Sequence, residues 1–282
     1  MNASLKNELE IFAVKSRLLM LEGVYNAKAG HPGGSLSIAE LLSYLYNVEL
    51  RVDPNDPHDE NRDRFVLSKG HAAPALYAAL ALKGFFPVED IKTLRKANSY
   101  LQGHPSMKSV PGVDMSTGSL GQGVSAAVGM ALAAKLDNKD YRVYTILGDG
   151  EIEEGQVWEA SMFASAKKLD NLVVIVDNNN LQIDGTVEEV NSPYPIPEKF
   201  MSFGFNTIEI DGNNLDEIES ALEKAKTVKG RPTAIIAKTV KGKGVSYMEN
   251  QVNWHGVAPN EELYNVAVEE LTAQLNALEG EK

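Results

Sequence analysis

The stretch Val143-Tyr144-Thr145-Ile146-Leu147-Gly148-Asp149-Gly150 indicates the fold of this chain. It joins an apolar run typical of a buried strand to an abrupt Gly-Asp-Gly end. Asn179 stands in an equivalent place, in Asn178-Asn179-Asn180 directly after the apolar run Leu172-Val173-Val174-Ile175-Val176-Asp177. Residues 153–168 between the two runs are expected to form a helix. A strand–helix–strand unit brings both strand ends to the carboxyl edge of a parallel sheet, so Asp149 and Asn179 are predicted to lie side by side.

The residue types at these two strand ends suit a metal diphosphate. Asp149 offers a carboxylate oxygen and Asn179 an amide oxygen, which leaves positions on a Mg²⁺ ion for water and for diphosphate oxygens. Gly148 and Gly150 allow close approach of the backbone, and the N-terminus of the following helix favours negative charge. The alternative is a pair of surface turns, since Asp-Gly and Asn-rich stretches are common in turns. Turns, however, require neither the intervening helix nor the matched strands.

The rest of the chain repeats the alternation of strands and helices. Further strands are expected at residues 65–68, 207–210 and 233–239, and further helices at residues 2–28, 72–82, 121–136, 215–228 and 261–278. Ser37-Ile38-Ala39-Glu40 has the pattern of a capping box at the start of another helix. The alternation predicts an α/β fold with a parallel sheet and helices on both faces. With no credible linker, residues 1–282 are expected to form one domain.

The composition restricts the class of protein. Hydrophobic residues make up 43% of the chain and charged residues 23%, as in ordinary globular proteins. No long apolar segment predicts a membrane span, and the first residues do not resemble a signal peptide, so a cytoplasmic protein is expected. The lack of cysteine excludes disulfides and thiolate chemistry. A net charge of −12 argues against nucleic acid as a partner.

The histidines are distributed in an unusual way. Of the five, His58 lies in a polar loop and is expected to be solvated. The other four stand beside glycine in breaks between predicted elements: His31, His71, His104 and His255. A single histidine of this kind more often packs or caps than reacts. Four in the same setting favour a shared functional site.

Taken together, the motifs closely resemble the N-terminal half of transketolase, over about residues 10–260. The Gly-Asp-Gly and Asn-Asn pair is typical of thiamine diphosphate enzymes. The other matching stretches are Ala29-Gly30-His31-Pro32-Gly33-Gly34, Asp63-Arg64-Phe65-Val66-Leu67-Ser68-Lys69-Gly70-His71, Gly103-His104-Pro105, Ser116-Thr117-Gly118-Ser119-Leu120-Gly121-Gln122-Gly123 and Trp254-His255-Gly256. The resemblance implies a thiamine diphosphate-binding fold of the diphosphate type. This chain departs only mildly from the family pattern: many transketolases have asparagine where this chain has Lys69 and proline where it has Ser119.

The resemblance also implies the roles of individual residues. His31 and His71 would flank the reacting carbonyl, His104 would contact the C1 or C2 oxygen of the donor, and His255 would lie near the diphosphate. The metal, Mg²⁺ or else Ca²⁺ or Mn²⁺, would be held by Asp149, Asn179 and the backbone carbonyl of Leu181. The cofactor contacts would be His71, Gly118, Leu120, Gly148, Asp149, Gly150, Glu151, Asn179 and His255. Glu154 would join a carboxylate network between subunits or simply complement a helix dipole.

The implied function is that of the N-terminal subunit of a split transketolase, which moves a two-carbon ketol unit from a ketose phosphate to an aldose phosphate. The family's pyrimidine-type domain and most of its phosphate-binding arginines are absent, so a second subunit is expected to supply them in an α2β2 heterotetramer. The small residues at 118–134 are expected at that contact. The predicted terminal helix and charged tail resemble a natural terminus. The acidic chain is expected to hold the diphosphate through Mg²⁺ and helix termini and not through a basic cluster.

Three other functions stay open at this point. One is an activity like that of 1-deoxyxylulose-5-phosphate synthase, and another is that of a transketolase subunit for unusual sugars. The third is a non-catalytic thiamine diphosphate-binding subunit, which would have no need of the four histidines. A Rossmann dehydrogenase is disfavoured because no G-x-G-x-x-G follows an early strand.

Overall fold

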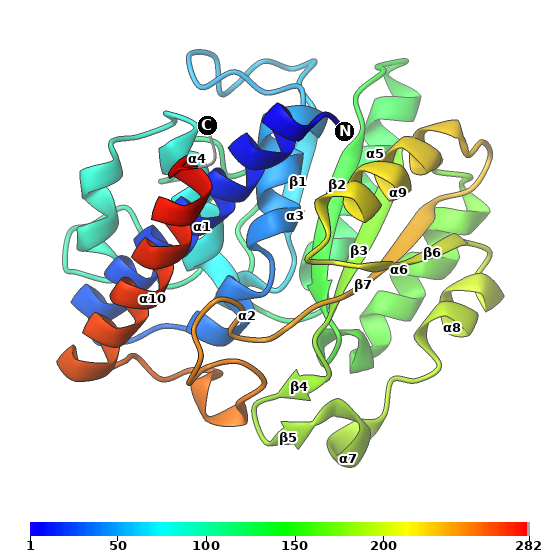
Figure 1. Ribbon diagram of the computed structural model, residues 1–282. Helices are drawn as coiled ribbons and strands as arrows, with labels where there is room; N and C mark the ends of the chain where they lie inside the picture. The colour runs from blue at the N-terminus through cyan, green and yellow to red at the C-terminus, as the bar shows by residue number, and fades with distance from the viewer. Residues whose placement is uncertain (281–282) are drawn as a thin grey trace.

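A five-stranded parallel sheet forms the centre of the chain in the computed structural model, which describes residues 1–280 (Figure 1). The strand order is β1-β2-β3-β7-β6. The strands are β1 (Arg64–Leu67), β2 (Val143–Gly148), β3 (Leu172–Asn178), β6 (Asn206–Asp211) and β7 (Thr233–Lys238). A short antiparallel hairpin of β4 (Leu181–Gln182) and β5 (Gly185–Thr186) follows β3.

Helices cover both faces of the sheet, as the alternation of elements predicts. The longer helices are α1 (Ala3–Ala27), α4 (Ala73–Leu82), α5 (Gln122–Leu136), α6 (Gly155–Ala166), α9 (Leu215–Thr227) and α10 (Glu261–Gly280). The shorter ones are α2 (Pro32–Leu36), α3 (Ala39–Tyr44), α7 (Val187–Asn191) and α8 (Ile196–Ser202). A π-helical turn (Leu45–Glu49) and 3-10 turns at Gly70–Ala72, Val88–Thr93, Glu151–Glu153 and Val252–Trp254 complete the chain.

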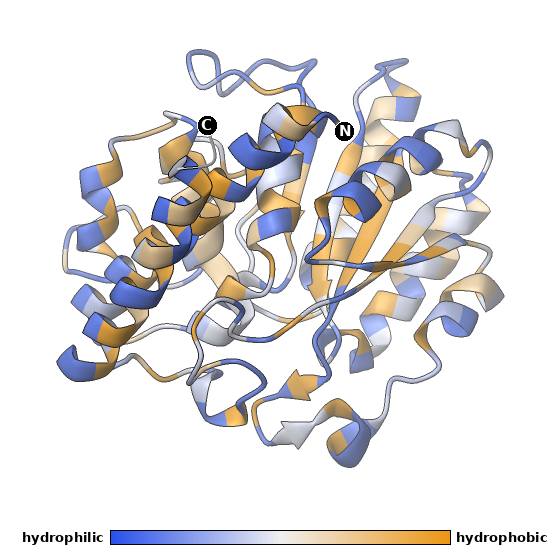
Figure 2. Cartoon of the chain, in the orientation of Figure 1, coloured by the Kyte–Doolittle hydropathy of each residue, from blue (hydrophilic) through white to orange (hydrophobic). Residues whose placement is uncertain are grey.

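Successive residues of the central strands face opposite layers of the core. In β3, Val173 and Ile175 pack with the helices α1, α3, α4 and α9 on one face. Val174 and Val176 pack with α5, α6 and α8 on the other. Both faces are buried, which is why β2 and β3 read as continuous apolar runs (Figure 2).

The strand–helix–strand unit predicted from the Gly-Asp-Gly motif is confirmed. β2 and β3 pair in parallel, with Gly148 opposite Asp177, and the Asp149 backbone N–H donates to the Asp177 carbonyl at 3.3 Å. The connecting helix is shorter than expected, because the 3-10 turn Glu151–Glu153 precedes α6. The two strand ends therefore meet at one edge of the sheet.

The predicted capping box at Ser37 is wrong. Helix α3 begins after Ile38, which caps it without a side-chain hydrogen bond. The Ser37 hydroxyl lies instead 2.8 Å from a carboxylate oxygen of Asp177, and Glu40 pairs with the buried Arg17 at 2.7 Å. Both side chains therefore bond to partners outside this helix and do not cap its N-terminus.

Across residues 1–280, no helix combines the length and the apolar character that crossing a bilayer requires.

Candidate functional site

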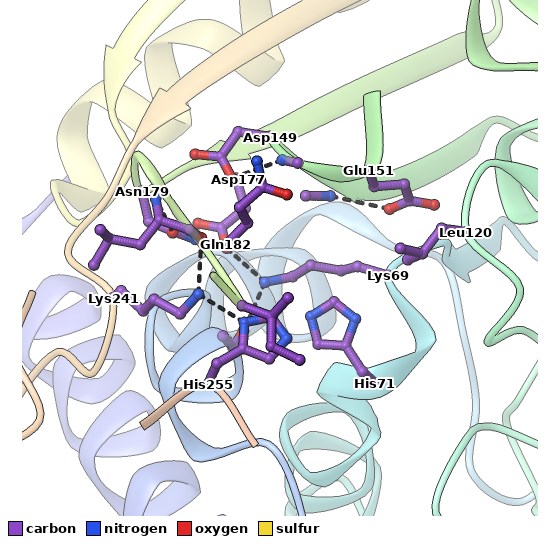
Figure 3. A pocket seen from close by; sticks show the side chains of 15 residues that line it. Lys69, His71, Leu120, Asp149, Glu151, Asp177, Asn179, Gln182, Lys241 and His255 are labelled. Carbon is purple, nitrogen blue, oxygen red and sulfur yellow. Dashed lines mark hydrogen bonds and ion pairs between the residues drawn. The ribbon is translucent and has the colours of Figure 1, made fainter. Parts of the chain in front are cut away.

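A cavity of about 210 Å³ opens at the carboxyl ends of β1, β2, β3 and β7. Parallel sheets place functional loops at this edge, where the strand ends converge. Figure 3 shows the charged and imidazole side chains gathered around the cavity. Its lining is Gly34, Lys69, His71, Leu120, Gly148, Asp149, Gly150, Glu151, Asp177, Asn179, Leu181, Gln182, Ile183, Lys241 and His255.

Asp149 is held rigidly at the end of β2. Its side chain is buried, and one carboxylate oxygen accepts hydrogen bonds from the Asn178 amide at 3.1 Å and the Asn180 backbone N–H at 2.5 Å. Burial, reinforced by the charge of Asp177, raises the pKa of Asp149 to about 6. An isolated charge is costly at such a position, so a cation beside Asp149 would relieve an existing penalty.

Asn179 and Leu181 lie next to Asp149, as the resemblance implies. The Asn179 Nδ2 donates to Asp177 Oδ2 at 2.9 Å, and its Oδ1 accepts the Leu181 backbone N–H at 3.2 Å. Leu181 lines the same cavity, and its carbonyl accepts a hydrogen bond from Lys241 at 2.8 Å. Three residues with oxygen atoms of different chemical types thus line one cavity.

Glu151 lines the cavity, but both oxygens of its carboxylate already accept hydrogen bonds from groups of the protein. Oε1 accepts hydrogen bonds from the Ser68 hydroxyl at 2.5 Å and the Gly121 N–H at 3.0 Å. Oε2 accepts the Gly148 N–H at 3.0 Å. Burial raises the pKa of Glu151 despite these hydrogen bonds. The Gly148 N–H is therefore already bonded within the protein, and Glu151 fixes the loop geometry.

The four glycine-flanked histidines form one cluster, although they come from four separate segments. The His31 ring lies 5.3 Å from that of His71, 6.3 Å from His104 and 5.6 Å from His255, measured between centroids. His58 is exposed in its polar loop, as expected. The structure thus brings together all four histidines that the sequence predicts to act together.

Burial lowers the pKa values of the clustered imidazoles. It is the main cause that lowers the pKa of His31 to about 4 and that of His255 to about 3, with nearby cationic groups adding to the effect. The pKa of His71 lies well below its usual value and that of His104 is also lowered, for the same main reason. Neutral imidazole both donates and accepts a hydrogen bond, which suits contacts with sugar hydroxyls and proton transfer.

Gly118 and Leu120 approach the site from the loop before α5. Gly118 has a φ of +147°, and a Cβ there would come within 2.9 Å of His104 Cδ2. Leu120 lines the cavity and is 37% exposed. Gly118 therefore contacts the histidine cluster, while Leu120 forms an open apolar wall.

Two buried lysines also line this cavity. The sequence motif places Lys69 near His71, but the sequence did not predict Lys241 there. Lys69 is 1% exposed and pairs with Asp177 at 2.5 Å. Lys241 is equally buried, and its Nζ lies 2.9 Å from His255 Nδ1; burial lowers the pKa of Lys241 to about 8. Two ammonium groups thus lie at the cavity of a chain that is acidic as a whole. The available signal was the position of Lys241 just after β7, at the same sheet edge as Asp149.

The cavity fits a metal diphosphate. Asp149, Asn179 and Leu181 supply the hard oxygen donors that Mg²⁺ prefers. Lys69 and Lys241 line the same cavity, and ammonium groups are common partners of phosphate oxygens in proteins. Among residues 1–280, no three histidine, aspartate or glutamate side chains are grouped so as to hold a metal. The site would therefore rely on amide and backbone oxygens beside one carboxylate.

Comparison with known proteins identifies the family of the chain. The family described as "Transketolase, thiamine diphosphate binding domain" matches residues 10–274. The chain is 50% identical to the "6-deoxy-6-sulfo-D-fructose transketolase subunit SqwG" of Clostridium sp. (strain MSTE9), over 90% of this chain and 93% of that protein. It is 45% identical to one of the subunits of the apulose-4-phosphate transketolase of Phocaeicola vulgatus, over 97% of each chain.

Solved structures show the same fold in longer chains. The chain superposes on transketolase from Campylobacter jejuni with a TM-score of 0.90 at 38% identity, covering 96% of this chain. It is also similar to transketolase from Pichia stipitis, with a TM-score of 0.88 at 32% identity. It spans 43% and 44% of the lengths of these two chains.

Proposed function

Because the chain belongs to the transketolase family, we propose that it is the N-terminal subunit of a split transketolase. It would move a two-carbon ketol unit from a ketose phosphate to an aldose phosphate. The observation that carries the proposal is that Asp149, Asn179 and Leu181 line the same cavity as His71 and His255 of the histidine cluster. Two relatives of similar length that are named as transketolase subunits support it.

Thiamine diphosphate, when bound, supplies the nucleophilic carbon and the electron sink of the reaction. The protein supplies position and charge. We assign metal binding to Asp149, Asn179 and the Leu181 carbonyl, with Mg²⁺, Ca²⁺ or Mn²⁺ as the ion. Lys69 and Lys241 offset the diphosphate charge. Gly148, Gly150 and Glu151 shape the loop around it, and Gly118 and Leu120 line the path to the ring.

The histidine cluster is assigned to the substrate. His31 and His71 hydrogen-bond the reacting carbonyl, His104 contacts a donor hydroxyl, and His255 sits between the substrate and Lys241. As neutral rings they donate a hydrogen bond to developing negative charge without carrying a charge themselves. His71 and His255 also contact the cofactor, since both line the cavity.

The cavity needs a second subunit to close it. Leu120 and Ile183 line it and remain 37% and 63% exposed, which suits a surface that a partner domain covers. Glu154 is exposed near the same loop. We assign the role of covering the cavity to a C-terminal subunit with a pyrimidine-type domain, in an α2β2 heterotetramer. In this assignment residues 1–282 form one diphosphate-type domain, and the enzyme works in the cytoplasm, where sugar phosphates are found.

A second candidate concerns the sugar. Both subunit relatives carry names of uncommon sugars, 6-deoxy-6-sulfo-D-fructose and apulose 4-phosphate. Their identities of 50% and 45% exceed the 41% shared with "Transketolase" of Homo sapiens. This favours a donor outside the pentose phosphate pathway over one within it.

The proposal is tested by reconstitution. The chain is purified alone and assayed for ketol transfer with thiamine diphosphate, Mg²⁺, a ketose phosphate and an aldose phosphate. The assay is repeated in the presence of the C-terminal subunit, and with sulfofructose and apulose 4-phosphate as donors. We expect activity only in the mixture. Full activity of the lone chain would contradict the split-enzyme proposal, and no activity with any donor in the mixture would contradict the assigned reaction.

A further inference from the structure

Asp177 is a buried acid on which four separate segments converge. It is fully buried near the end of β3. Its Oδ2 accepts hydrogen bonds from the Ser37 hydroxyl at 2.8 Å, Lys69 Nζ at 2.5 Å and Asn179 Nδ2 at 2.9 Å, and its Oδ1 accepts the Thr239 hydroxyl. These donors follow α2, β1, β3 and β7. No functional contact has so far been assigned to this carboxylate.

The carboxylate determines which way the Asn179 amide faces. An ionised carboxylate only accepts hydrogen bonds, so the amide must turn its NH₂ group toward Asp177. Its Oδ1 then faces the other way, where it accepts the Leu181 N–H at 3.2 Å and keeps a second lone pair. The amide orientation is thus defined from both ends. Without a fixed acceptor at Asp177, only the Leu181 N–H would hold the amide in this orientation.

Lys69 keeps Asp177 in the acceptor role. Its ammonium bridges Asp177 Oδ2 and the Gly34 carbonyl at 2.5 and 2.6 Å, and its side chain is 1% exposed. Because an ammonium group has only donors, the oxygen it meets must accept. The pair therefore holds both the charge of the carboxylate and its rotamer, through the same oxygen that accepts from Asn179.

We propose that Asp177 is the positioning residue of the metal site, acting by holding Asn179 with its amide oxygen toward the cation. The inference rests on the proposed function, because it presupposes that Asn179 is a metal ligand. Partners behind a metal ligand commonly change metal affinity by about 10–100-fold when they are removed. The competing explanation is that Asp177 only neutralises the buried Lys69 and has no effect through Asn179.

A double-mutant cycle separates these explanations. The variants are Asp177→Asn, Asn179→Ala and the two combined, each as full chain with the C-terminal subunit. Calorimetry measures thiamine diphosphate binding as Mg²⁺ is varied, and thermal unfolding without cofactor measures folding. Thr239→Val is the matched control, because Thr239 touches the other carboxylate oxygen and not Asn179.

If Asp177 acts through Asn179, Asp177→Asn raises the Mg²⁺ requirement by about 10–100-fold. Asn179→Ala then has little further effect in the Asp177→Asn background, and Thr239→Val stays near the wild type. Additive effects of the two substitutions would overturn the inference while leaving the proposed function intact. Absence of Mg²⁺-dependent binding in the wild-type complex would overturn both.

A second genetic background, with Lys69→Met added, provides the test if the Asp177→Asn variant does not fold. Removing Asp177 alone leaves a buried ammonium without a counter-ion, which is strongly destabilising. If Asp177→Asn does not fold, Lys69→Met is added, which removes that charge. The comparison then asks whether Asn179→Ala still weakens Mg²⁺-dependent binding in this background. An undiminished effect of Asn179→Ala would again show that Asp177 does not position it.

Discussion

The imidazole rings of His71 and His255 stack with their centroids 5.3 Å apart and an angle of 29° between their planes. His71 lies in the 3-10 turn after β1, and His255 follows the 3-10 turn after β7. β2 and β3 separate those two strands in the sheet, so the loops must fold back over the strand ends to meet. Lys241 lies beside the stacked rings, with its Nζ 2.9 Å from His255 Nδ1.

The clustered histidines should make the protein less stable as the pH falls. Their folded-state pKa values, about 4 for His31 and about 3 for His255, lie below the ordinary value of 6.5. The unfolded chain therefore binds protons first, and stability is lost as the pH falls from about 6.5 toward 4. The measurement is the free energy of unfolding of the lone chain by denaturant at several pH values.

A pair of variants tests the assignment of that pH dependence. His31→Asn should flatten the decline between about pH 6.5 and 4, because one buried imidazole no longer has to take up a proton. His58→Asn, at an exposed position outside the cluster, is the control and should keep the wild-type slope. Equal slopes in both variants would show that the cluster does not cause the decline.

The four clustered histidines should matter more for rate than for folding. Alanine at His31, His71, His104 or His255 should lower the rate of the reconstituted enzyme by about 10²–10⁴-fold if these groups handle protons or developing charge. The melting temperature should change little, because the four residues lie in glycine-flanked segments and not on periodic apolar faces. His58→Ala is the control for rate. Unfolding of all four variants would instead identify the cluster as structural.

Asp149 should be required for metal-dependent cofactor binding. Asp149→Ala removes the carboxylate from the set of oxygen donors, so affinity for thiamine diphosphate at fixed Mg²⁺ should fall severely. Its pKa of about 6 adds a further expectation: wild-type Mg²⁺ affinity should weaken as the pH falls through 6, since protons then compete with the metal. Calorimetry with the partner present measures both, with Asp56→Ala as the exposed control. Unchanged affinity in Asp149→Ala would refute the assignment.

Gly118 should be intolerant of a side chain for a geometric reason. A Cβ at Gly118 would lie 2.9 Å from His104 Cδ2, at a φ of +147° that side chains rarely adopt. Gly118→Ala should therefore displace His104, and a shift of about 1 Å costs roughly 10²-fold in rate. Gly129→Ala is the matched control, because nothing lies within 4 Å of that position in α5. It should stabilise the lone chain by about 0.5–1 kcal/mol, measured by thermal unfolding. A wild-type rate in Gly118→Ala would disprove the close contact.

The sheet and the main site residues were predictable because their signals are local. The apolar runs of β2 and β3 are long and buried on both faces, so each reads as a strand on its own. The position of Asp149 beside Asn179 follows from the pairing of those strands. The capping box at Ser37 was predicted wrongly for the opposite reason. A hydroxyl can satisfy its hydrogen bond with a distant partner, here Asp177, that no local pattern reveals.

The parallel α/β fold, the adjacency of the two motif-bearing strand ends and the set of histidines in glycine-flanked breaks all follow from the sequence alone. These depend on periodicity, strand pairing rules and glycine, which act over short stretches. The folded chain was needed to show that Lys69 and Lys241 line the cavity. It was also needed to show that the Glu151 carboxylate accepts hydrogen bonds from backbone N–H groups and that Asp177 accepts one from the Asn179 amide. Those outcomes depend on which loops meet over the sheet edge. A buried charge must find a partner wherever the fold provides one, and that partner is distant in the sequence.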